Sequence, residues 1–237
     1  MAETETQYHI NGLRWAEATA ARHAAYVQAN QSEASVLWVS DVDGPLINSD
    51  LAWHGDYSRL ATEKGVPEES IVDLATFAPS PRTHYQTLNL VSDYSLYKDW
   101  LMSNGPFHAD MRAADDAAAT LPALAARNVP GGYISARPEV IGGVTRQSLD
   151  AAGFAPAPLL MRSKDVAYDQ TIVYKCDPLL LLVRALARHK ATANTLVKYV
   201  EDYERVVTTI NNLGIPQLSG VYYGPHTTWN EILSSAV

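Results

Sequence analysis

Two aspartates separated by one residue stand at the end of a short apolar run. Residues 36–39 are apolar, and Ser40-Asp41-Val42-Asp43-Gly44 follows them. A carboxylate can act as a nucleophile or bind a hard cation such as Mg²⁺, and a second one nearby can donate and accept protons. Alone, Asp-x-Asp-Gly also fits a turn or a calcium loop. Residues 44–48 lack the further carboxylates that a calcium loop requires.

Three more polar clusters follow along the chain. They are Ser135 with Arg137, Lys175 alone, and Glu201 with Asp202. With the two aspartates they supply carboxylates, a hydroxyl, an ammonium group and a guanidinium group. This set suits phosphoryl transfer through an aspartyl phosphate, because Mg²⁺ and fixed cations offset the repulsion between carboxylate and phosphate. In a purely structural interpretation, Ser135 and the Glu201-Asp202 pair would cap the helices that follow them.

The elements that must position these groups alternate between strands and helices. Apolar runs typical of buried strands occur at 36–39, 132–134, 158–161, 195–200 and 220–223. Helices are expected at 10–31, 138–152, 177–189 and 203–213, the third with Asp177 as its N-cap. The alternation predicts an α/β fold with a doubly wound, Rossmann-like parallel sheet. Ligands of such sheets bind at the carboxyl ends of the strands, where the polar clusters fall.

The segment 49–111 interrupts this alternation. No good strand is expected between Leu46 and Met111, but helices are expected at 51–64, 68–75 and 85–103. We predict a helical cap, 49–111, inserted after the first strand of a core formed by 1–48 and 112–237. Caps close over sites and supply specificity. The candidate substrate contacts in this segment are Trp53, His54, Tyr57, Arg59 and Arg82.

Composition limits the classes of partner. Of the 237 residues, 47% are hydrophobic and 19% are charged, as in a globular protein. The net charge of -8 argues against long nucleic acid as a partner. The single cysteine, Cys176, excludes an intrachain disulfide and suits a reducing compartment. The polar start and the lack of a long apolar run predict a cytoplasmic protein without a membrane partner. The oligomeric state is not indicated.

The motifs resemble those of phosphatases of the haloacid dehalogenase (HAD) superfamily. Residues 41–46 resemble the first motif, 134–138 the second, Lys175 the third and 200–202 the fourth, in the family's order. The resemblance covers the chain from about Val36 to its end, and it implies a sheet of the HAD type and Mg²⁺ as cofactor. Pro45 stands where threonine is commonest in the family, and Glu201 replaces the first aspartate of a common pair.

The resemblance also implies roles. Asp41 would be the nucleophile and a metal ligand, and Asp43 the general acid and base, with its backbone carbonyl on the metal. Ser135 would bind the phosphoryl group, and Lys175 would stabilise its negative charge. Asp202 would be the second carboxylate ligand of the metal.

Two further residues have supporting roles in this scheme. Glu201 would act behind Asp202 or through a water molecule. Arg137 would add a phosphate contact, since the string 135–138 and the stretch 161–175 are similar to the phosphatase domain of phage polynucleotide kinase.

The function favoured by the sequence is Mg²⁺-dependent hydrolysis of a small soluble phosphate ester, such as a sugar phosphate, a nucleotide or another metabolite. A phosphomutase or a polynucleotide 3′-phosphatase would share the same motifs. A dehalogenase would share the nucleophile but needs neither Asp43 nor Mg²⁺. The alternative outside enzymes is a binding module with a degenerate site.

Overall fold

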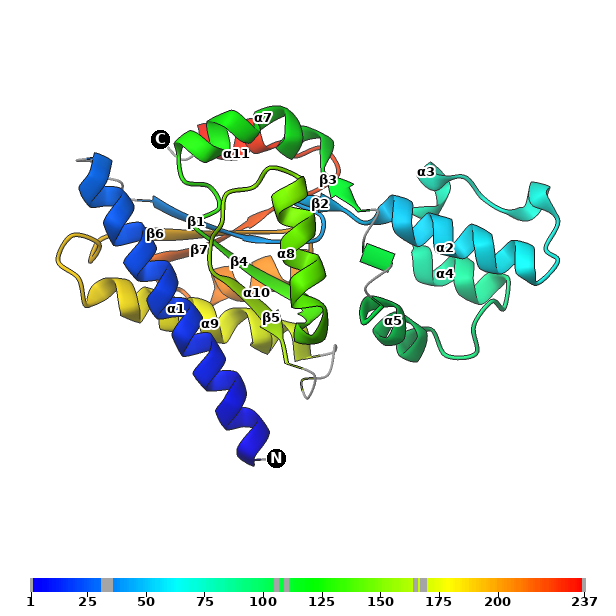
Figure 1. Ribbon diagram of the computed structural model, residues 1–237, viewed down its shortest axis with the longest axis horizontal. Helices are drawn as coiled ribbons and strands as arrows, with labels where there is room; N and C mark the ends of the chain where they lie inside the picture. The colour runs from blue at the N-terminus through cyan, green and yellow to red at the C-terminus, as the bar shows by residue number, and fades with distance from the viewer. Residues whose placement is uncertain are drawn as a thin grey trace.

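The centre of the molecule is a five-stranded parallel sheet. The computed structural model describes residues 2–30, 36–104, 107–108, 111–163, 166 and 170–235, with side chains in the first helix from His9 onward (Figure 1). The strand order is β5-β4-β1-β6-β7. These strands are β1 (Val36–Asp41), β4 (Gly132–Pro138), β5 (Leu159–Arg162), β6 (Leu196–Glu201) and β7 (Leu218–Tyr222). Each strand overlaps one of the apolar runs predicted from the sequence, so the predicted α/β fold is confirmed.

Helices cover both faces of this sheet (Figure 1). One face is covered by α1 (Ala2–Asn30), α9 (Thr171–Ala187) and α10 (Glu204–Asn212). The other face is covered by α7 (Asp115–Ala126), α8 (Gly142–Ala151), which follows a 3₁₀ turn at Glu139–Ile141, and α11 (Trp229–Ser234). None of the helices within the described ranges is long and apolar enough to cross a membrane.

The side chains of β1 alternate between the two cores. Leu37 and Val39 lie in the core under α1 and α9, whereas Trp38 lies in the core under α7 and α11. Asp41 follows Val39 by two residues and so points toward the face that α9 covers. The alternation thereby determines which helix can reach this carboxylate.

Helix α9 begins earlier than expected. The helix predicted for 177–189, with Asp177 as N-cap, instead begins at Thr171 and contains Pro178 in its interior. Proline lacks the N–H that would bond to the carbonyl four residues earlier, but the apolar side of α9 packs closely in the core beside α1. Tertiary packing therefore outweighs the local signal. As a result, Lys175 lies inside the helix and not in a loop before it.

A helical insertion lies beside the sheet, at the right of Figure 1. It is bounded by β2 (Ile47–Asn48) and β3 (Arg112–Ala113), which pair antiparallel. It contains α2 (Asp50–Glu63), a 3₁₀ turn at Glu68–Ser70, α3 (Leu74–Phe77), α4 (Pro81–Thr87) and α5 (Tyr94–Met102). These helices enclose an apolar cluster of their own around Tyr57, Phe77 and Tyr85. A role as a cap remains a prediction for 49–111.

Local structure in the insertion departs from expectation in three places. The short strand β2 occurs where no strand was expected. The helix expected at 68–75 is a 3₁₀ turn followed by α3, and the helix expected at 85–103 is divided into α4 and α5. The division follows from Asn89, which has a φ of 50°, and from Asp93, which caps α5 by accepting from the backbone N–H groups of Ser95 and Leu96.

Candidate active site

Two carboxylates lie side by side at the carboxyl ends of adjacent strands. Strands β1 and β6 pair in register, with Ser40 opposite Val200, so Asp41 and Glu201 are the next residues on each strand. Both side chains are buried and both point toward α9. Without a cation, two buried carboxylates at this spacing would repel each other strongly.

Lys175 supplies a cation between these carboxylates. Its Nζ donates to Oδ2 of Asp41 at 2.7 Å and to Oε2 of Glu201 at 2.6 Å. Burial disfavours the charged form of Lys175, but the two carboxylates outweigh this effect and hold its pKa above the ordinary value. Burial raises the pKa of Asp41 well above its ordinary range, although Lys175 opposes the change. The site is therefore short of positive charge.

Glu201 is held by several donors at once. Besides Lys175, Oε2 accepts from the hydroxyl of Tyr199 at 2.9 Å, and Oε1 accepts from the backbone N–H of Tyr203 at 3.1 Å. Tyr199 lies two residues earlier on β6 and so shares the same face of the sheet. With both oxygens accepting hydrogen bonds, Glu201 is placed to orient Lys175.

Asp202 completes a group of three carboxylates. One ligand oxygen from each of Asp41, Glu201 and Asp202 lies within 4.8 Å of the others. Asp202 is exposed on its outer side, yet desolvation by surrounding protein and the negative charge of Asp41 raise its pKa to about 6. The group fits a hard divalent cation such as Mg²⁺, because its donors are all oxygens and their crowded negative charges favour a cation.

Gly44 makes room for Asp202. Gly44 has a φ of 83°, and a β-carbon there would lie 2.4 Å from Oδ2 of Asp202. The glycine of the Asp-x-Asp-Gly string is therefore required both by its backbone conformation and by this close approach. It allows the loop after β1 and the end of β6 to meet.

Asp43 is paired with Arg137. The Nε and Nη2 atoms of Arg137 donate to Oδ2 and Oδ1 of Asp43 at 2.9 and 2.7 Å, and Nη2 also lies 3.0 Å from the sulfur of Met111. Burial tends to raise the pKa of Asp43, but the charge and hydrogen bonds of Arg137 outweigh it and lower that pKa. Nη1 of Arg137 is buried without a hydrogen-bond partner among the described residues.

Ser135 and Arg137 lie on an irregular part of β4. Ser135 pairs with Met161 of β5, but the next pair joins Pro138 to Arg162, so β4 has two extra residues, Ala136 and Arg137. We call these two residues the β4 bulge. Ser135 is fully buried, and its Oγ accepts from the backbone N–H of Arg137 at 3.1 Å. The bulge sets the direction of Arg137, which reaches Asp43 across the strand ends.

The structure brings the predicted residues together in two adjoining groups. Asp41, Lys175, Glu201 and Asp202 form the first; Asp43 and Arg137, with Ser135 at the bulge, form the second. Sequence reasoning missed the contributions of Tyr199, Met111 and Arg162. The available signal for Arg162 was its position directly after a predicted strand, 158–161. The stretch 161–175, which is similar to the phosphatase domain of phage polynucleotide kinase, also contains Asp169, and this residue lies outside the described residues.

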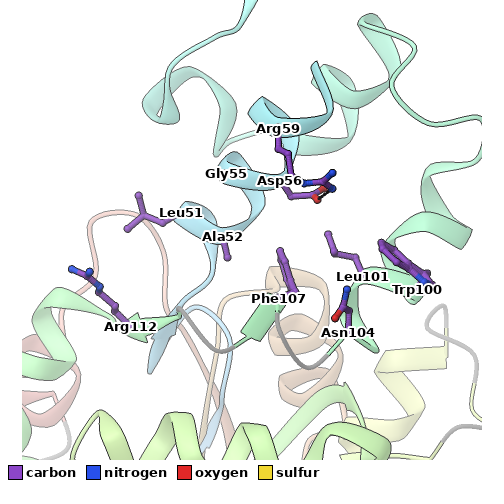
Figure 2. A pocket seen from close by; sticks show the side chains of 10 residues that line it. All are labelled: Leu51, Ala52, Gly55, Asp56, Arg59, Trp100, Leu101, Asn104, Phe107 and Arg112. Carbon is purple, nitrogen blue, oxygen red and sulfur yellow. Dashed lines mark hydrogen bonds and ion pairs between the residues drawn. The ribbon is translucent and has the colours of Figure 1, made fainter. Parts of the chain in front are cut away.

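The five candidate substrate contacts in the insertion lie in three environments. Trp53 and Arg82 line a pocket of about 750 Å³ between α2, α4 and α5. Arg59 lines a second pocket, of about 760 Å³, which Figure 2 shows between α2, Trp100 and Arg112.

The remaining two candidates belong to the interior of the insertion. Tyr57 is buried there, and Nε2 of His54 lies 2.8 Å from the carbonyl oxygen of Val72. Packing explains these two side chains without a ligand.

Comparisons with known proteins give similarity in structure but not in sequence. No protein-family model matches the sequence, and no curated protein gives a significant match. Among solved structures, the fold is similar to that of a HAD hydrolase, family IA, variant 3, from Entamoeba histolytica HM-1:IMSS, with a TM-score of 0.41 and 14% sequence identity. The similarity covers 84% of this chain and 98% of that chain. A TM-score this low assigns no family, so the geometry of the site carries the functional conclusion.

Proposed function

We propose that the protein is a Mg²⁺-dependent phosphatase of the HAD type that hydrolyses a small phosphate monoester through an aspartyl phosphate on Asp41. The observation that carries this proposal is the arrangement around Asp41. Lys175 donates to its Oδ2 at 2.7 Å, while Oδ1 accepts from the backbone N–H of Val42 at 2.8 Å. A buried carboxylate held by two donors is oriented for attack on an electrophile brought to the strand ends.

The cluster of three carboxylates, Asp41, Glu201 and Asp202, supports Mg²⁺ as the cofactor. Asp41 and Asp202 would hold Mg²⁺, with Glu201 behind them because its oxygens already accept from Lys175, Tyr199 and Tyr203. The backbone carbonyl of Asp43 is the further ligand that the resemblance to HAD phosphatases implies. When bound, the cation would offset the negative charges of the carboxylates and the phosphate.

In the proposed reaction Asp41 is the nucleophile. An oxygen of Asp41 attacks phosphorus, and the bond from phosphorus to the ester oxygen breaks. The departing oxygen takes a proton from Asp43. A water molecule then attacks the phosphorus of the aspartyl phosphate and gives its proton to Asp43, releasing inorganic phosphate and restoring the carboxylate of Asp41.

The pair formed by Asp43 and Arg137 bears on this proton transfer. While the pair is intact, Asp43 is held ionised and cannot donate a proton. A phosphate dianion attracts the guanidinium of Arg137, and the unpartnered Nη1 offers it a hydrogen bond. Sharing the charge of Arg137 with phosphate would make Asp43 easier to protonate, as its role as an acid requires.

The insertion supports a small substrate. Residues 49–111 would act as a cap, and the pocket lined by Trp53 and Arg82 would hold the group that leaves with the ester oxygen. A phosphomutase or a 3′-phosphatase would use the same groups around Asp41, so the reaction products distinguish them. A dehalogenase would have no need for the carboxylates that fit a cation.

The test is substitution of the nucleophile. Purified protein should hydrolyse an aryl phosphate and members of a panel of phosphate monoesters when Mg²⁺ is present. Asp41→Asn should lower turnover at least about a thousandfold, with an unchanged circular dichroism spectrum. Full activity in this variant would refute the assignment of Asp41. Absence of metal-dependent turnover across the panel, with the wild-type protein folded, would refute the phosphatase and favour a binding module.

A further inference from the structure

Arg162 at the end of β5 contacts three separate segments of the chain. It is almost fully buried, with 5% of its surface exposed. Its Nε donates to the carbonyl oxygen of Ala136 at 3.0 Å, its Nη1 to that of Val166 at 2.6 Å, and its Nη2 to Oδ1 of Asp99 at 3.2 Å. A planar guanidinium can serve three acceptors in fixed directions, which a lysine cannot do.

The first contact supports the β4 bulge. Ala136 is one of the two extra residues of β4, so the regular ladder to β5 is interrupted at its position. Ala136 is half-buried, and a carbonyl shielded from water costs free energy when it lacks a partner; Nε of Arg162 supplies the donor. Ala136 lies between Ser135 and Arg137, the two residues of β4 placed at the phosphate site.

The contact between Arg162 and Asp99 joins the insertion to the sheet. Asp99 belongs to α5, and its side chain is 45% exposed, whereas that of Arg162 is 6% exposed. In Figure 1, α5 lies on the side of the insertion nearest to the core. Asp99 also lines the pocket that contains Trp53 and Arg82. A single side chain thus connects this pocket to the β4 bulge.

We propose that Arg162 is a positioning residue that couples the seating of the insertion on the core to the geometry of the β4 bulge, with Asp99 as its contact on the insertion. The proposal rests on the proposed function for its effect on phosphate. When α5 is seated, Asp99 fixes one edge of the guanidinium, and Nε stays directed at Ala136. When α5 moves away, the guanidinium loses this restraint, and the bulge that carries Ser135 and Arg137 becomes less ordered.

The experiment uses Asp99→Ala, Arg162→Lys and the double variant. Asp99→Ala removes only the contact on the insertion, and alanine suits the helix. Arg162→Lys keeps the charge but loses the three-way contact. Glu69→Ala is the matched control, because Glu69 is another exposed acid on the insertion. Affinity for inorganic phosphate in Mg²⁺ is measured by calorimetry, and kcat and KM are measured with an aryl phosphate.

The expected result is a coupled loss of phosphate affinity. Arg162→Lys should weaken phosphate binding about tenfold or more, as loss of a supporting hydrogen bond does at other sites. Asp99→Ala should weaken it about threefold, within the range for a half-exposed ion pair, although Asp99 touches no predicted phosphate ligand. The double variant should bind as Arg162→Lys does. Additive losses, or an Asp99→Ala affinity equal to that of Glu69→Ala, would overturn the coupling.

A second measurement separates this proposal from the proposed function. Hydrogen exchange of peptides covering 133–138 reports the order of the β4 bulge without any turnover. Both Asp99→Ala and Arg162→Lys should speed exchange there, and Glu69→Ala should not. Unchanged exchange in Asp99→Ala would overturn the proposal even in an active enzyme, and a wild-type protein that neither binds nor hydrolyses phosphate would refute only the proposed function. Asp99→Ala decides the matter if Arg162→Lys does not fold.

Discussion

Gly44 and Asp202 are in direct contact: a β-carbon on Gly44 would lie 2.4 Å from Oδ2 of Asp202 and 2.6 Å from its carboxyl carbon. The two residues come from opposite ends of the chain, one after β1 and the other after β6. Their contact places the loop after β1, which follows the proposed nucleophile Asp41, against the Glu201-Asp202 pair at the end of β6. A substitution at Gly44 can therefore displace the side chain of Asp202 while all the carboxylates of the site are kept.

Gly44→Ala should displace Asp202. The variant should need more Mg²⁺ for half-maximal turnover, and the positive φ should cost roughly 1 kcal/mol of stability. The control is Gly65→Ala, which has a similar φ of 73° but has no described atom within 4 Å of its added β-carbon. Both should lose stability in urea denaturation, and only Gly44→Ala should change the Mg²⁺ requirement. Equal Mg²⁺ requirements in the two variants would contradict the role given to this contact.

Lys175→Met should lower both stability and turnover. It would leave Asp41 and Glu201 without the cation that their side chains share, and breaking a buried pair costs about 3 kcal/mol or more. Lys190→Met, at an exposed position, is the control and should be neutral. Thermal unfolding with and without Mg²⁺ is the measurement. Because a divalent cation would offset the same carboxylates, Mg²⁺ should stabilise Lys175→Met more than it stabilises the wild type.

Removal of the metal should abolish turnover reversibly. A chelator should stop hydrolysis of an aryl phosphate, and added Mg²⁺ should restore it. Asp202→Asn should raise the Mg²⁺ concentration for half-maximal rate about tenfold or more, since a carboxylate ligand loses its charge. Asp150→Asn, an exposed acid on α8, serves as the control. Turnover that persists in the chelator would exclude the proposed cofactor.

His108 should make stability depend on pH. Burial and the nearby positive charge of Arg137 lower the pKa of His108 to about 4. His108 therefore binds a proton more readily in the unfolded chain than in the folded one. Its contribution to the free energy of unfolding is fully present above about pH 6.5 and is lost as the pH falls toward 4. For one histidine the loss between pH 8 and pH 5 is roughly 2 kcal/mol.

The check is urea denaturation of wild type and His108→Gln at both pH values. The wild type should lose more stability than the variant between pH 8 and pH 5, because glutamine does not titrate. Equal losses would show that His108 does not titrate in this way. Other titrating groups affect both proteins alike and cancel in the comparison.

The positions of the strands in the sequence, and the parallel class of the sheet, could be predicted because parallel strands buried on both faces need continuous apolar runs. From that pattern Asp41 and Glu201 could be placed at the carboxyl ends of two strands, but the adjacency of these strands comes from the folded sheet. Helix boundaries were harder to predict from the sequence. Asp177-Pro178 is a local signal for a helix start, but packing of the whole apolar face of α9 outweighed it, and the helix begins at Thr171. The direction of Lys175 depended on that boundary.

Contacts between distant side chains could not be predicted. The pairing of Arg137 with Asp43 depends on the β4 bulge, and a bulge depends on how two strands register, not on either sequence alone. The same holds for Arg162, whose partners Ala136 and Asp99 are 26 and 63 residues away. The residue types were visible in the sequence, but their partners were set by the folded sheet.

The paired strands β2 and β3 have a consequence for how such a chain can change. The chain leaves the core at Ile47 and returns opposite it at Ala113, and the N–H of Ala114 donates to the carbonyl of Leu46 at 2.8 Å. Both junctions are therefore held together by the core's own backbone. The segment between them can therefore lengthen, shorten or be exchanged for another while the core sheet stays the same. Under the proposed function, recognition by the insertion and chemistry at the sheet are free to evolve at different rates.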